Sequence, residues 1–91
     1  LENPNARGLL ICGSGQGMAI RANKYPHIRA ALCWSEESAK LSREHNDANV
    51  LCVGSRLLSE ELILKIFDQF VAQDFEGGRH QARVDKLSRP I

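Results

Sequence analysis

The residue whose surroundings most favour chemistry is Cys12. It ends an apolar run over residues 8–12 and stands directly before a segment with three alternating glycines, Gly13-Ser14-Gly15-Gln16-Gly17. This pattern predicts a buried strand, a tight turn and the start of a helix. Backbone N–H groups in such a turn can converge on an anion, and a thiol beside them can be a reactive thiolate. Ligands of parallel sheets bind outside the carboxyl ends of the strands, where Cys12 is expected to lie.

Other interpretations of the glycine segment are open. A dinucleotide-binding fingerprint requires a third glycine where Met18 stands, although Glu36 follows at a suitable distance for a ribose hydroxyl. A phosphate-binding P-loop is excluded because no Gly-Lys-Ser/Thr sequence follows. An anion or oxyanion site is therefore favoured over NAD binding. A purely structural turn, with Cys12 as an ordinary buried strand residue, remains the plain alternative.

Two further polar groups could take part in chemistry. His45 and Asn46 stand just before an expected strand, and a histidine there can act as a general acid near neutral pH. Arg79 and Arg83 are four residues apart, so on a helix they share a face and can bind a phosphate. The plain alternatives are a capping or surface histidine and a solvated basic face.

Composition excludes several classes of protein. The net charge is +1 and no basic run occurs, which argues against nucleic-acid binding. No apolar run approaches the roughly 20 residues of a membrane span, and the first residues do not resemble a signal peptide. The three cysteines form no CxxC pair, and His27 and His80 lack partners at metal-ligand spacing, so we expect reduced thiols, a cytoplasmic location and no metal site.

Strands and helices are expected to alternate along the chain. Ser35, with Ser38 three residues later, and Ser59 are expected to cap helices. The expected strands cover residues 8–12, 29–34 and 50–54; the expected helices cover 18–23, 35–44, a segment from 59 with the core stripe Leu62, Ile63, Ile66, Phe67, Phe70 and Val71, and 79–87. This order predicts a single α/β domain over residues 1–91, a three-layer α/β/α structure with a parallel sheet. Three strands leave an exposed apolar edge, so further strands or a partner should cover it.

Taken together, these segments resemble the type B ribose-5-phosphate isomerases, in a family that also holds allose-6-phosphate and galactose-6-phosphate isomerases. The matching blocks are Leu10-Ile11-Cys12-Gly13-Ser14-Gly15, Ala22-Asn23-Lys24, Arg29-Ala30-Ala31-Leu32-Cys33, residues 42–50, Gly54-Ser55-Arg56 and Phe75-Glu76-Gly77-Gly78-Arg79-His80. The resemblance implies a Rossmann-like sheet and aldose–ketose isomerisation through a cis-enediolate, without metal or cofactor.

The resemblance also implies a role for each matching position. Cys12 would be the base that moves a proton between C1 and C2 of the sugar, and the backbone of residues 13–17 would hold the enediolate oxygen. His45 would open the sugar ring and Asn46 would hold a hydroxyl. The phosphate would be bound by Arg79 and Arg83, assisted by Arg56. Sites in this family form between subunits, which implies a homodimer or a homotetramer.

The chain departs from the family pattern in three places. Ala19 replaces a usual serine, and Gln16 replaces an aliphatic residue. The family's first strand ends in an Asp-His pair that helps to open the sugar, and this pair is expected before the region covered here. We therefore expect a C-terminal part of the fold. Ribose 5-phosphate isomerisation is the first hypothesis, and a non-catalytic, truncated sugar-phosphate-binding or interaction module is the alternative.

Overall fold

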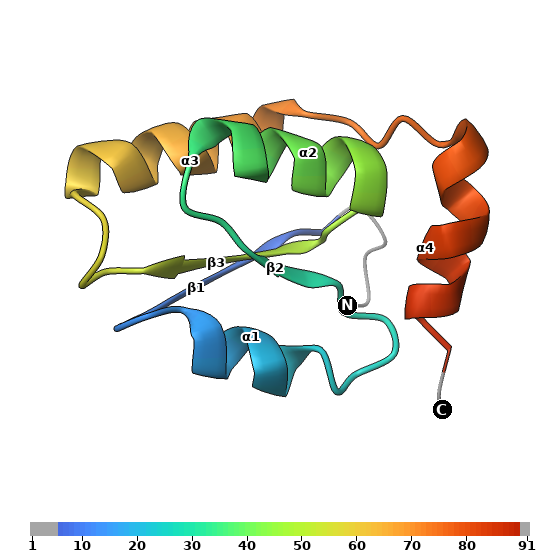
Figure 1. Ribbon diagram of the computed structural model, residues 1–91, viewed down its shortest axis with the longest axis horizontal. Coiled ribbons are helices and arrows are strands. Elements are labelled where there is room, and N and C mark those ends of the chain that lie inside the picture. The colour runs from blue at the N-terminus through green and yellow to red at the C-terminus, as the bar shows by residue number, and fades with distance from the viewer. Residues whose placement is uncertain (1–5, 90–91) are drawn as a thin grey trace.

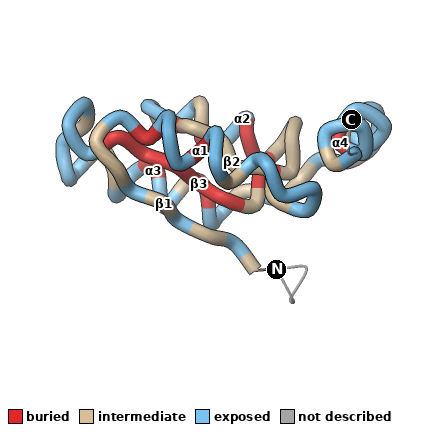
Figure 2. The backbone as a smooth tube through the Cα atoms, turned by 90° about the horizontal axis from the view of Figure 1, so that it is seen from below, coloured by how far each residue is buried: buried red, intermediate tan, exposed pale blue. Residues whose placement is uncertain are grey.

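Strand β3 (Val50–Gly54) is the centre of the sheet in the computed structural model, which describes residues 6–89. It pairs in parallel with β1 (Gly8–Cys12) on one side and with β2 (Ala30–Leu32) on the other. The strand order is therefore β1-β3-β2. All residues of β3 are buried because both of its edges and both of its faces are covered. Figure 2 shows this strand as the most continuous buried part of the chain.

The helices lie on both faces of this sheet (Figure 1). Helix α1 (Gln16–Ala22) covers one face, and α2 (Glu36–Asn46) and α3 (Glu60–Ala72) cover the other. A 3-10 turn, η1 (Gly78–His80), leads into α4 (Gln81–Leu87), which stands beyond one end of the sheet. The predicted parallel, three-layer α/β/α fold is therefore confirmed. No helix within residues 6–89 has the length and apolar character needed to cross a membrane.

Two apolar clusters form the core, one on each side of the sheet. Leu51 and Val53 of β3 pack with Ile66 and Phe70 of α3 on one side. Val50 and Cys52 point to the other side, towards α1. Successive residues of a strand point to opposite faces, so an uninterrupted apolar β3 can serve both clusters.

The expected apolar stripe of α3 is wider than its buried face. Ile66 and Phe70 are buried, and Leu62 and Ile63 pack partly against the core. Phe67 and Val71, also expected in the core, are 37% and 49% exposed. That part of the prediction is wrong for this chain, because α3 packs on β3 and α2 along a single side.

The helix caps follow the sequence closely. Ser35 accepts a hydrogen bond from the Ser38 backbone N–H at 3.1 Å, and the Ser38 hydroxyl bonds back to the Ser35 N–H at 3.1 Å. Ser59 likewise accepts from the Leu62 N–H at 3.2 Å. Helix α2 runs two residues beyond the predicted end at 44 and stops at Asp47, whose φ of 47° is left-handed. The left-handed residue ends the helix and frees the chain to enter β3.

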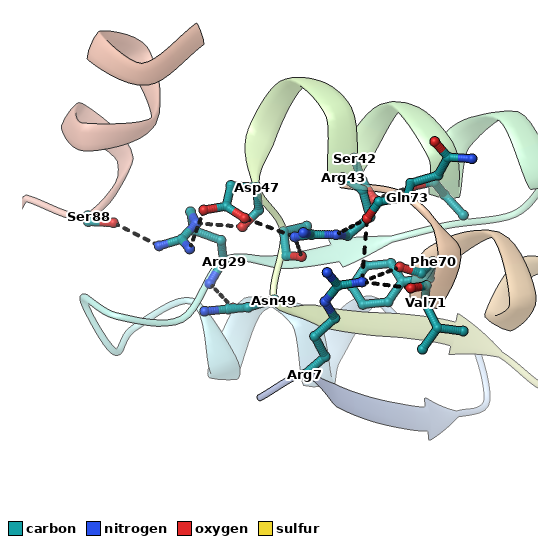
Figure 3. A network of polar contacts seen from close by, with 12 residues as sticks. Arg7, Arg29, Ser42, Arg43, Asp47, Asn49, Phe70, Val71, Gln73 and Ser88 are labelled. Carbon is teal, nitrogen blue, oxygen red and sulfur yellow. Dashed lines mark hydrogen bonds and ion pairs between the residues drawn. The ribbon is translucent and has the colours of Figure 1, made fainter. Parts of the chain in front are cut away.

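A buried guanidinium holds the end of α2 in place (Figure 3). Arg43 donates to the Ala48 carbonyl at 2.6 Å and the Gln73 carbonyl at 3.1 Å, and pairs with Asp47 at 2.9 Å. Arg29 reaches the same carboxylate at 3.3 Å. This network joins the end of α2 to the segment after α3. It therefore fixes the backbone that carries His45 and Asn46 at the end of α2.

Strand β1 forms an apolar edge. Leu9 and Ile11 are 41% and 50% exposed although they belong to the sheet. Their neighbours across the ladder, Leu51 and Val53, are fully buried. The exposed apolar edge expected from the sequence is therefore present on β1.

Candidate active site

The turn after β1 holds the thiol of Cys12. The Gly15 N–H donates to the Cys12 Sγ at 2.9 Å, which fixes the sulfur inside the glycine turn. Gly15 has a φ of 81°, and a Cβ at this position would lie 2.6 Å from Leu32 Cδ1 and 2.9 Å from the Val53 carbonyl carbon. Only glycine fits this position, because both its backbone conformation and the space around it exclude a side chain.

The segment after β3 supports the same turn. The Ser55 N–H donates to the Cys12 carbonyl at 2.8 Å, and the Arg56 N–H donates to the Gly13 carbonyl at 3.0 Å. A Cβ on Gly13 would lie 3.3 Å from the Arg56 side chain, so this guanidinium lies against the turn. Ser14 and Gln16 line a shallow pocket of about 210 Å³ beside the turn. Gly17 lies in the first turn of α1.

Two glycines make a matched test of how closely the turn is packed. A Cβ on Gly54 would lie 2.6 Å from the Ser14 carbonyl oxygen, whereas one on Gly17 would meet nothing within 4 Å. Gly54→Ala should therefore lower the free energy of unfolding by about 1–3 kcal/mol through overpacking. Gly17→Ala, inside a helix, should raise it by up to about 1 kcal/mol. Urea denaturation followed by circular dichroism measures both changes. Equal effects of the two substitutions would contradict the close approach of Gly54 to the turn.

Among the cysteines, Cys12 alone is only partly buried. Cys33 and Cys52 are buried, and all three are free thiols. Burial raises the pKa of Cys33, and burial together with the other thiols raises the pKa of Cys52 to about 11. These two side chains therefore stay protonated near neutral pH. Cys12 is therefore the most accessible of the three thiols.

A second polar cluster forms where α2 meets η1 and α4. The His45 and His80 rings stack with their centroids 4.5 Å apart and their planes at 18°. Arg83 donates to the Asn46 side chain and to the His45 carbonyl, and its Nη2 lies 3.1 Å from Nδ1 of His80. Partial burial lowers the pKa of His80, and the charges of His45, Arg79 and Arg83 lower it further. The predicted residues His45, Asn46 and Arg83 thus lie together, with Arg79 close by in η1.

His80 was expected to lack partners for a metal site, but the fold brings two such groups beside it. Donor atoms of His45, Glu76 and His80 lie within 4.8 Å of one another, although His45 is distant from the other two in the sequence. Arg83 nevertheless approaches Nδ1 of His80. A guanidinium only donates, so this contact favours the tautomer with the proton on Nε2, the atom that would face the metal. The positive charges of Arg79 and Arg83 also oppose a cation, so the cluster supports no metal proposal.

The two parts of the expected site lie at opposite ends of the sheet. Cys12 is the last residue of β1, at its carboxyl end, and His45 precedes the amino end of β3. Strand β3, five residues and about 13 Å long, runs between these two ends. They lie at the left and right sides of the sheet in Figure 1. Arg56 lies with Cys12, away from Arg79 and Arg83. The predicted site residues therefore form two separate groups in one chain.

The strand order argues against the alternative of NAD binding. In a dinucleotide-binding fold the first two strands are neighbours, so the glycine turn and the acidic residue after the second strand face one ligand. Here β3 lies between β1 and β2. Glu36, which begins α2 after β2, is therefore one strand farther from the turn than that fold requires.

Sequence reasoning did not single out Glu76 and His80 as functional. Glu76 faces both stacked imidazoles, with its Oε1 3.5 Å from Nε2 of His80 and 3.7 Å from Nε2 of His45. The spacing of four residues between Glu76 and His80, across two glycines, was the available signal. The third member, His45, lies far away in the sequence and joins the cluster only through the fold.

The fold is that of a parallel α/β protein with a thiol and a glycine turn at the carboxyl edge of its sheet. A family model described as Ribose/Galactose Isomerase matches residues 1–87. The chain belongs to this ribose/galactose isomerase family.

Individual relatives agree with this assignment. The chain is 51% identical over 81 residues to the ribose-5-phosphate isomerase B of Escherichia coli, covering 89% of this chain and 54% of the relative. It is 50% identical over 82 residues to a probable ribose-5-phosphate isomerase B of Mycoplasma genitalium, covering 90% and 54%. The chain thus spans about half the length of these curated relatives.

Solved structures show the same likeness. A ribose 5-phosphate isomerase from Thermotoga maritima superposes with a TM-score of 0.89 at 48% identity, over 90% of this chain and 57% of that one. The Mycoplasma genitalium enzyme, solved with bound ribulose-5-phosphate, gives a TM-score of 0.88 at 49% identity, over 90% and 54%.

Proposed function

We propose that the full-length protein is a sugar-phosphate aldose–ketose isomerase that interconverts ribose 5-phosphate and ribulose 5-phosphate. The observation that carries the proposal is the thiol turn at the end of β1. There the Gly15 N–H donates a hydrogen bond to Cys12 Sγ. The sequence of the chain is about half identical to that of a ribose-5-phosphate isomerase B over the residues that align. A cytoplasmic location, where free thiols stay reduced, belongs to the same proposal.

In this mechanism Cys12 is the base. The thiolate removes the proton from C2 of the open-chain aldose, and the electron pair moves to give a cis-enediolate. The same group returns the proton to C1 while the hydroxyl proton of O2 passes to O1, so that C2 becomes the ketone carbonyl and there is no net change of protons. Backbone N–H groups of the turn at residues 13–17 stabilise the oxyanion as it forms, because a turn fixed by the fold needs little reorganisation during the reaction. No redox cofactor takes part in this proton transfer.

The two groups of residues at opposite ends of the sheet would be half-sites of one active site, and the half-site with His45 would open the ring and bind the phosphate. His45 transfers the ring-opening proton, Asn46 holds a hydroxyl, and Arg79 and Arg83 bind the phosphate with Arg56 assisting. Because the two half-sites lie at opposite ends of the sheet in one chain, they can face one substrate when two copies associate. We therefore propose a homodimer, or a larger assembly built from it, with the site at the interface.

Incubation of the full-length protein with ribose 5-phosphate in D2O tests the proposal. We expect ribulose 5-phosphate to form with deuterium bound to carbon, because a base that exchanges with solvent carries the proton. Proton NMR of the sugar follows both the conversion and the exchange. Absence of conversion by a folded protein would contradict the proposed activity.

Removing one phosphate-binding arginine should weaken substrate binding. Arg79 is the clearer choice, because Arg83 also supports the end of α2. Arg79→Gln is expected to raise KM about 10- to 100-fold, since hydrogen bonds to charged groups contribute about 1.5–3 kcal/mol. Arg21→Gln, on the exposed surface of α1, is the control and should leave KM unchanged. Steady-state kinetics measures both variants, and equal KM values would remove Arg79 from the phosphate site.

The alternative is a non-catalytic sugar-phosphate-binding module. Such a module would bind the sugar phosphate through Arg79 and Arg83 without converting it. Two measurements separate the two functions. Calorimetry of this chain with ribose 5-phosphate detects binding, and an activity assay of the full-length protein detects turnover. Binding without turnover by the full-length protein would support the module, and turnover would exclude it.

A further inference from the structure

The segment between α3 and α4 is shaped to bring two side chains against His45. The Glu76 N–H donates to the Glu44 carbonyl at 3.0 Å, which ties the segment to the last turn of α2. Gly77 and Gly78 then adopt left-handed conformations, with φ of 69° and 54°. These two residues reverse the chain, and η1 places the His80 ring on the His45 ring at 4.5 Å. Such consecutive conformations require glycine.

We infer that Glu76 and His80 are positioning residues that fix the ring orientation and tautomer of His45, leaving its Nδ1 to transfer the ring-opening proton. The inference rests on the proposed role of His45 in sugar isomerisation. It assigns Glu76 and His80 as the groups that orient His45, and Nδ1 of His45 as the nitrogen that contacts the substrate.

The tautomer of His80 follows from its contact with Arg83. The Arg83 Nη2 lies 3.1 Å from Nδ1 of His80, and a guanidinium can only donate. Nδ1 therefore accepts, and the proton of the neutral ring resides on Nε2, which faces Glu76 Oε1 at 3.5 Å. Burial and the nearby positive charges lower the pKa of His80, so the neutral ring predominates near neutral pH. His80 is thereby held between Arg83 and Glu76.

The tautomer of His45 follows from the same carboxylate. Its Nε2 lies 3.7 Å from Glu76 Oε1, and an ionised carboxylate only accepts, so the proton of the neutral ring is drawn to Nε2. This distance is long for a hydrogen bond, as is common for catalytic contacts before substrate binds. No hydrogen bond within residues 6–89 engages Nδ1 of His45. Its lone pair is therefore left for the substrate.

A single nitrogen, Nδ1 of His45, carries out both proton transfers of ring opening. Nδ1 of His45 takes the proton of the anomeric hydroxyl, C1 and its oxygen form the carbonyl, and the bond between C1 and the ring oxygen breaks. The same nitrogen returns the proton to the former ring oxygen. The carboxylate of Glu76 stabilises the transient imidazolium from the opposite nitrogen, as an orienting carboxylate does in other acid–base pairs.

The first test reads the tautomers directly in this chain. Long-range ¹⁵N–¹H spectra of the three histidines, in mildly alkaline buffer, distinguish Nδ1–H from Nε2–H rings. We expect His45 and His80 to be Nε2–H, and Glu76→Gln to convert His45 to a mixture. His27 is the internal control. A His45 tautomer that is unchanged by Glu76→Gln would overturn the inference. Glu76 is exposed and glutamine has the same shape, so the fold should be retained.

The second test separates ring opening from proton transfer in the full-length protein. Ribulose 5-phosphate has no free C5 hydroxyl to close a five-membered ring, so deuterium exchange at its C1 requires Cys12 but no ring opening. Glu76→Gln should lower kcat for ribose 5-phosphate about 10- to 100-fold, less than the roughly 10²- to 10⁴-fold contribution of a general acid–base group, because His45 itself is retained. It should leave KM and the exchange rate within about twofold of wild type. Glu37→Gln, on the first turn of α2, is the matched control.

The outcomes of the second test are distinct. Equal loss of both reactions in Glu76→Gln would show a general structural effect and overturn the inference. Absence of both reactions in the wild-type protein would instead refute the proposed isomerase activity. The tautomer measurement needs no activity, so it still decides whether Glu76 and His80 position His45.

Discussion

Cys12→Ala is expected to lower kcat for ribose 5-phosphate about 10²- to 10⁴-fold, the range of a lost general base. KM should change little, because the thiol is proposed to act on the reacting carbons and contributes little to binding the phosphate. A fall in kcat and kcat/KM together is the signature of an interaction made only in the transition state. Steady-state kinetics of the full-length protein measures it. Deuterium exchange into ribulose 5-phosphate should be lost to the same extent.

The other cysteines provide the control for this prediction. Cys52→Ala removes a thiol that lies fully inside the core, where burial and the other thiols raise the pKa to about 11. It should lower stability but leave kcat of the folded protein unchanged. Iodoacetamide should modify Cys12 first, because Cys33 and Cys52 are buried. Near-normal turnover of Cys12→Ala would show that another group is the base.

Phe70→Ala should be the most destabilising single truncation in α3. Phe70 is 1% exposed, packs with Leu51 and Ile66, and has the Arg43 guanidinium 5.9 Å from its ring centroid. Loss of a buried phenylalanine costs about 3–5 kcal/mol, through lost burial and the cavity that remains. Domains of this size have only about 5–15 kcal/mol of stability, so the variant should be close to unfolded in mild denaturant.

Phe67→Ala is the matched control, because it changes the same residue type one turn away in the same helix. Phe67 is 37% exposed, so its loss should cost about 1 kcal/mol or less. Urea denaturation of this chain, followed by far-ultraviolet circular dichroism, compares the two variants. Similar midpoints for the two would contradict the assignment of Phe70 to the core and Phe67 to the surface.

Much of the fold was predictable because its signals are local. The predicted bounds of β1 and β3 are those observed, and the serine caps at Ser35 and Ser59 begin α2 and α3 as expected. Continuous apolar runs, capping hydroxyls and glycine turns act over a few residues, so the chain encodes them directly. The width of the α3 core was overestimated. Helical spacing shows which residues share a face, whereas burial depends on what packs against that face.

The sequence by itself determined that Cys12 ends a strand, that glycines follow it, and that two arginines share a helical segment. The tertiary structure decided where these groups lie relative to one another. It holds the thiol in the turn through the Gly15 N–H and places the histidine–arginine cluster at the other end of the sheet. It also brings Glu76 and His80 to His45, more than 30 residues earlier in the chain. That meeting depends on the Arg43 network and two left-handed glycines, which act across separate elements and leave no periodic pattern in the sequence.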